Sequence, residues 1–151
     1  MIHNDPIDQG VEAKLRDIIR IKTNGENWLT KRDEQEVLTI AVERLGIPLS
    51  RAQTIISSEA SSGKLKLEKN GETVVSAMVD ALAGPKRKLK KSFFDLISQY
   101  YAKINERIET EAQAKVKKIM VQQGVLPKGE GIFGSTRWYR LISVDDTTSA
   151  N

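Results

Sequence analysis

The chain has no cysteine and a single histidine, His3, among its 151 residues. It can therefore form no disulfide and no thiolate metal site, and the lack of cysteine fits a reducing compartment. A serine or threonine nucleophile would lack a plausible base, and no set of His, Asp and Glu has the spacing of metal ligands. We therefore expect a protein that is not an enzyme and holds no metal or other cofactor.

Long apolar runs are also missing from the sequence. No stretch approaches the ~20 apolar residues that a membrane-spanning helix needs. The first residues lack the charged and apolar regions of a signal peptide. These two absences predict a cytoplasmic protein without a transmembrane segment.

Aromatic residues are scarce, at 5% of the chain, and all except Trp28 lie in its C-terminal half. Four of them form two doublets within one helical pattern. Adjacent residues on a helix point about 100° apart, so a narrow core stripe cannot bury both members of a doublet. The alternatives are a wide core face or a partner-binding surface made of Phe93, Phe94, Tyr100 and Tyr101.

Positive charge is modest in total, at +4, but it is concentrated along the sequence. Residues 86–91 hold five cations in six positions, and further groups lie at 115–118 and 128–140. Such groups attract polyanions, either nucleic acid or anionic lipid, although a solvated helix face is the alternative. The candidate nucleic-acid-binding residues are Lys86, Arg87, Lys88, Lys90, Lys91, Lys115, Lys118, Gln122, Lys128, Arg137 and Arg140.

Helical spacing of apolar residues dominates the first half of the chain. It predicts four helices, at about 7–22, 31–45, 50–60 and 74–82. Residues 64–69 alternate polar and apolar side chains before Asn70-Gly71, which predicts a short strand and a tight turn. A returning strand through Val74-Val75 is the alternative to the fourth helix.

The clearest boundary is Gly84-Pro85, and the longest helical pattern, residues 86–123, follows it. This pattern is either one helix or two, and we expect a break at Glu109-Thr110. No internal repeat is visible. The predicted fold is mainly α, with about six helices and one or two small β-hairpins. Its expected parts are an N-terminal helical subdomain (1–84), a long basic helix with a C-terminal hairpin (85–144) and a disordered tail (145–151).

Residues 129–134 read G-x-G-x-x-G, the spacing of a dinucleotide-binding loop. That loop needs a strand before it and a helix after it. Here a helix and Pro127 precede the glycines, and residues 136–142 alternate as a strand would, so we do not expect nucleotide binding. The glycines fit the tip of a hairpin better.

A basic helix followed by such a hairpin resembles a winged-helix domain over residues 89–142. The resemblance implies a recognition helix at 110–123, with Lys115, Lys118, Gln122 and Gln123 facing duplex DNA. It also implies a wing that contacts the DNA through Lys128, Arg137 and Arg140. A purely structural hairpin is the alternative.

The N-terminal part resembles the TerB-like helical domains. Residues 24–34 read N-G-E-N-W-L-T-K-R-D-E, and the helix after them ends in Leu45-Gly46-Ile47. Asn24 stands where that family has aspartate, so we do not carry over the family's acidic metal site. The first hypothesis for the whole chain is a non-enzymatic nucleic-acid-binding regulator or accessory factor. The alternative is a TerB-like adaptor that docks a protein partner through the aromatic helix, and a homodimer stays open.

Overall fold

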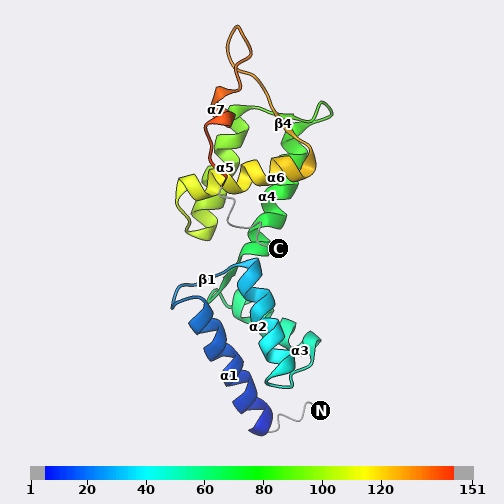
Figure 1. Cartoon of the computed structure of the whole chain (residues 1–151), viewed down its shortest axis with the longest axis vertical. Coiled ribbons are helices and arrows are strands. Elements are labelled where there is room, and N and C mark those ends of the chain that lie inside the picture. Colours follow the sequence, from blue (N-terminus) through cyan, green and yellow to red (C-terminus); the bar gives the residue numbers. More distant parts are fainter. Residues whose placement is uncertain (1–5, 145–151) are drawn as a thin grey trace. The chain divides into compact units, whose positions relative to one another are not determined.

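The computed structural model describes residues 6–144, and the chain divides into two compact units between Lys69 and Asn70. This part of the chain contains seven helices and four strands of two residues each (Figure 1). The prediction of a mainly α fold is confirmed.

Unit 1 consists of three helices and one pair of strands. Thr30 caps the second helix as the sequence suggests, because its hydroxyl accepts a hydrogen bond from the amide of Asp33. The strands run parallel, with Trp28 opposite Lys66. The elements of this unit are α1 (Pro6–Lys22), β1 (Trp28–Leu29), α2 (Lys31–Glu43), α3 (Leu49–Ser61) and β2 (Lys66–Leu67).

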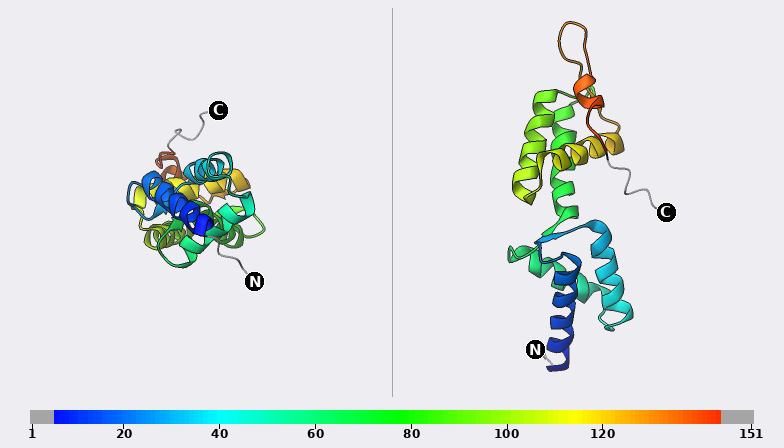
Figure 2. Two further views of the ribbon diagram at one scale, coloured as in Figure 1. Left: turned by 90° about the horizontal axis from the view of Figure 1, so that it is seen from below. Right: turned by 60° about the vertical axis from the view of Figure 1, so that its left-hand side comes forward.

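Unit 2 is built around a second parallel pair, with Lys88 opposite Leu126. Helices α5 and α6 make its most extensive packing contact, and they lie side by side in the right-hand view of Figure 2. Its core includes the fully buried side chains of Phe94, Ile97 and Tyr101. The elements are α4 (Glu68–Ala83, whose first two residues belong to unit 1), β3 (Lys88–Leu89), α5 (Lys91–Asn105), α6 (Glu109–Gln123), β4 (Leu126–Pro127) and α7 (Arg137–Arg140).

The two units repeat one architecture, helix–strand–helix–helix–strand, at a spacing of 60 residues. Both partners of the first strand pair, residues 28 and 66, correspond at this spacing to residues 88 and 126. Buried positions correspond in the same way, as in Leu15 and Val75, Leu29 and Leu89, Val37 and Ile97, and Ile56 and Val116. The expectation that the chain has no repeat is wrong. The repeat lies in the pattern of buried side chains, since few residue types are identical.

Several local expectations also differ from the structure. The unit boundary lies in the first turn of α4, between Lys69 and Asn70, rather than after that helix at Gly84-Pro85, because the buried Val75 and Val79 of α4 belong to unit 2. Residues 70–75 continue α4 and form neither a turn nor a strand. The pattern at 86–123 is interrupted by β3 and by a break at 106–108, so it contains two helices. The predicted tail, 145–151, lies outside the described residues.

The turn between the second and third helices requires a left-handed residue in both units, Gly46 (φ +66°) in unit 1 and Glu106 (φ +52°) in unit 2. A side chain at such a φ costs about 1–2 kcal/mol. We expect Gly46→Ala to lower the free energy of unfolding by about 1 kcal/mol in a urea titration. Gly10→Ala, within helix α1, is the matched control, and it should raise that free energy by about 0.5–1 kcal/mol. Neither added methyl group would meet a neighbouring atom, so a loss at both positions would contradict the backbone argument.

Candidate nucleic-acid interface

The β3–β4 pair brings together two basic segments that are far apart in the sequence. The amide of Leu126 donates to the carbonyl of Arg87 (3.0 Å), and the amide of Lys128 donates to that of Leu89 (2.8 Å). Side chains alternate along a strand. Because Leu89 is buried, the neighbouring Lys88 and Lys90 are turned outward, and both are exposed.

Helix α7 packs beside the β3–β4 pair through contacts with α5, α6 and Lys128. The Trp138 ring lies 5.2 Å from the Phe94 ring, and its Nε1 donates to the carbonyl of Lys128 (3.4 Å). On the other side, Lys117 Nζ donates to the carbonyls of Tyr139 (2.9 Å) and Ile142 (3.0 Å). The sequence predicts a strand at 136–142, and that prediction is wrong for residues 137–140, because these contacts hold them as a helical turn.

Six cations lie on these joined elements and are exposed. Within residues 6–144 none of their side chains lies within 4 Å of a carboxylate oxygen in an ion pair, although Lys90 Nζ lies 5.6 Å from the centre of the Phe93 ring. Arg137 and Arg140 are three residues apart in α7 and so lie on one side of it. We call the six residues the basic cluster: Lys86, Lys88, Lys90, Lys128, Arg137 and Arg140.

The candidate cations of α6 are placed differently. Lys115 Nζ lies 2.7 Å from a carboxylate oxygen of Glu72, and each of these side chains is less than one-fifth exposed. This pair ties α6 to α4. Lys118 is half-buried, and Gln122 is exposed in the last turn of α6. The structure therefore gives Lys115 a packing role within unit 2 rather than a place on an open DNA-binding face.

Two further candidates in the 86–91 segment also have acidic partners. Arg87 pairs with Asp80 (2.6 Å) and donates to the carbonyl of Gln123. Lys91 pairs with Asp95 (2.7 Å), and the hydrogen bond to that carboxylate raises the pKa of Lys91, with a smaller contribution from the charge of Glu130. Arg87 and Lys91 thus stabilise unit 2 beside the basic cluster.

Between β4 and α7 the chain forms a loop, residues 129–135, whose ribbon projects beyond both elements (Figure 1). Glu130 and Ser135 close it through two backbone hydrogen bonds of 2.8 Å each. At its tip Ile132 and Phe133 are 97% and 96% exposed. Sequence reasoning found the hairpin-like turn but overlooked these side chains, although two large apolar residues between glycines were visible in it.

The aromatic doublets divide between core and surface. Phe94 and Tyr101 are fully buried, so the prediction that they bind a partner is corrected. Phe93 is half-buried and Tyr100 is exposed. Together with two exposed neighbours on α5 they form what we call the apolar stripe: Phe93, Leu96, Tyr100 and Ile104.

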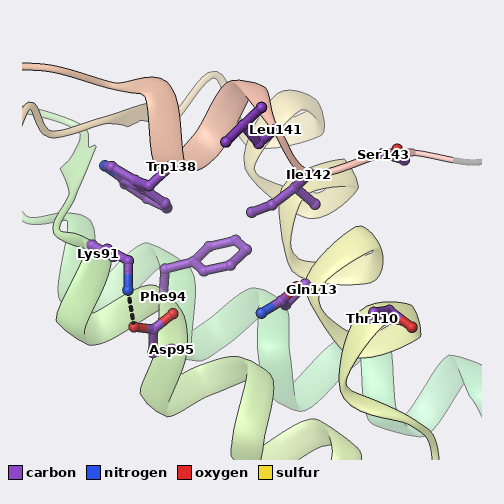
Figure 3. Close-up of a pocket in the computed structure, with 9 residues that line it drawn as sticks. All are labelled: Lys91, Phe94, Asp95, Thr110, Gln113, Trp138, Leu141, Ile142 and Ser143. Carbon is purple, nitrogen blue, oxygen red and sulfur yellow. Dashed lines mark hydrogen bonds and ion pairs between the residues drawn. The ribbon is translucent and has the colours of Figure 1, made fainter.

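A pocket of about 490 Å³ lies where α7 and the residues after it cover α5 and α6 (Figure 3). The rings of Phe94 and Trp138 form much of its wall, and Gln113 reaches toward it from α6. Lys91 and Asp95 both line the pocket, and they form an ion pair with each other. No group of three or more His, Cys, Asp or Glu side chains in the described part of the chain could hold a metal ion.

Comparisons of the chain with protein-family models, with curated proteins and with solved structures each gave no match. Among residues 6–144, no helix is both long enough and apolar enough to cross a membrane. The winged-helix and TerB-like resemblances therefore stay predictions made from the sequence.

Proposed function

We propose that this chain is a non-enzymatic protein that binds duplex DNA through the basic cluster of unit 2. The observation that carries the proposal is the presence of six exposed cations on the β3–β4 pair, on the residues that flank it and on α7, while neighbouring cations pair with carboxylates. Lysine and arginine side chains displace counterions from phosphates, and this release drives binding that does not depend on base sequence. Small regulators and accessory factors of DNA act in this way.

The comparison of the two units supports this proposal, because the shared architecture does not require the cations. At the spacing of 60 residues, four residues of the basic cluster correspond to residues of unit 1 that carry no positive charge. Lys86 corresponds to Glu26, Lys88 to Trp28, Lys90 to Thr30 and Lys128 to Glu68. A reason other than folding is therefore needed for the positive charge of unit 2.

The test is fluorescence anisotropy of a labelled duplex, titrated with the full chain at several salt concentrations. We expect binding whose logarithmic salt dependence is linear, and Lys88→Ala with Lys128→Ala should reduce the slope by about two. The matched control is Lys14→Ala with Lys64→Ala, which removes two exposed lysines of unit 1 and should leave the slope unchanged. Equal effects of the two pairs would show attraction by net charge alone and would overturn the assigned site.

The alternative function, a helical adaptor for a protein partner, is favoured by the apolar stripe of α5. The stripe positions correspond in unit 1 to Asp33, Glu36, Ile40 and Arg44, most of which are charged, so the architecture does not require an apolar surface here. Absence of DNA binding at low salt would overturn the first proposal and favour this one.

A further inference from the structure

We propose that the tip of the 129–135 loop enters the minor groove of the bound duplex and wedges Ile132 and Phe133 between base pairs, bending the DNA. This inference rests on the DNA-binding function proposed above. Apolar wedges that unstack a base step are a known means of kinking DNA, and isoleucine and phenylalanine are among the residues that form them.

The exposure of the tip is the first observation that supports a wedge. Ile132 and Phe133 are 97% and 96% exposed, so they make almost no contact with the other residues of the range 6–144. Burying a large apolar side chain stabilises a folded protein by roughly 1.5–3 kcal/mol. The exposure of these two adjacent side chains therefore leaves that stabilisation unused in the folded chain. Unit 1 has no corresponding loop, because its second strand ends at Leu67 and α4 begins at Glu68.

The narrowness of the loop is the second observation. Gly131 and Gly134 lie on either side of the tip, and both have a positive φ that disfavours larger residues. A Cβ on Gly129 would lie only 2.2 Å from the carbonyl oxygen of Gly134, so the two legs of the loop touch. The minor groove is about 6 Å wide, and a loop whose legs touch, with only the side chains of Glu130 and Ser135 behind its tip, is a narrow element suited to that groove.

The placement of charge is the third observation. Lys128 immediately precedes the loop and Arg137 follows it closely, so a cation stands at the foot of each leg. Phosphates border the minor groove on both sides, which matches this arrangement. An anionic membrane would also attract the cations and take up the apolar tip, but insertion into a bilayer does not call for glycines that narrow the loop.

Both legs are also fixed before any ligand arrives. The first leg continues from β4, just after which the backbone amide of Lys128 donates to the carbonyl of Leu89. The second leg runs into α7, where the Trp138 ring packs on the Phe94 ring. The two hydrogen bonds between Glu130 and Ser135 join the legs. Such preorganisation lowers the entropy lost on binding. More of the binding free energy is therefore left to distort the DNA.

The test uses a duplex of about 25 base pairs with a central TA step and a fluorophore at each end. Energy transfer reports bending, and anisotropy of the same duplex reports binding. The full chain should increase energy transfer. Ile132→Ala with Phe133→Ala should abolish most of the increase, leave the salt slope unchanged and weaken binding by no more than about tenfold. The matched control is Leu126→Ala with Leu141→Ala, two exposed leucines outside the loop, which should bend the DNA as the unaltered chain does.

The failures of the two proposals can be told apart. Binding without bending, or equal bending by the Ile132/Phe133 variant, would overturn the wedge and leave the DNA-binding proposal standing. No binding at low salt would overturn both. Cosedimentation with phosphatidylserine-containing vesicles, lost in the Ile132/Phe133 variant, would assign the tip to a membrane and also overturn the wedge.

Discussion

Giving unit 2 the residues that unit 1 carries at three positions of the basic cluster should weaken binding to duplex DNA at least about a hundredfold at low salt. The changes are Lys86→Glu, Lys90→Thr and Lys128→Glu, which introduce the residues found at positions 26, 30 and 68. Each lost phosphate contact lowers the salt slope by about one, so the slope should fall by about three. The two new carboxylates would also repel the phosphates. Anisotropy over a series of salt concentrations measures both effects.

This triple variant should keep its fold, because unit 1 adopts the same architecture with these residues. All three lysines are exposed, and none forms an ion pair with another described residue within 4 Å. The matched control is Lys14→Glu, Lys64→Glu and Lys103→Thr, which lowers the net charge from +4 by the same five units. Its cations are exposed and lie outside the basic cluster. Equal loss of affinity in the two variants would contradict a localised binding site.

Local periodicity made most of the helices predictable. Apolar residues at steps of three and four determine α1 and α2, and the hydroxyl of Thr30 determines where α2 begins. Local signals failed where a distant contact decides the structure. Residues 136–142 alternate like a strand, yet Trp138 on Phe94 and Lys117 on the carbonyl of Tyr139 stabilise a helical turn there.

The repeat and the parallel strand pairs were not predictable for a related reason. A strand of two residues is too short to show alternation, and each pair joins positions that are 38 residues apart. The candidate site was partly predictable, since the runs of lysine and arginine are visible in the sequence. Which cations have acidic partners was not, because Glu72, which meets Lys115, is also far away along the chain.

Phe94→Ala should have the largest effect on stability, lowering the free energy of unfolding of unit 2 by about 3–5 kcal/mol. Phe94 lies on α5 and is fully buried, and the ring of Trp138 on α7 packs against its ring. A urea titration followed by Trp138 fluorescence measures this loss. The other tryptophan, Trp28, belongs to unit 1, so a Trp28→Phe background makes Trp138 the sole reporter.

Phe93→Ala is the matched control, since it is the same change one residue earlier in the same helix. Phe93 is only half-buried, and about 1 kcal/mol is the loss expected from partial burial. Equal shifts of the urea midpoint for the two variants would contradict the division of the aromatic doublet between core and surface. At the position corresponding to Phe94, unit 1 has Glu34, which is also buried and bonds to Lys69 just after β2. In both units the side chain at this position therefore contacts the segment that follows the second strand. In unit 2 that segment carries the 129–135 loop and both arginines of the basic cluster.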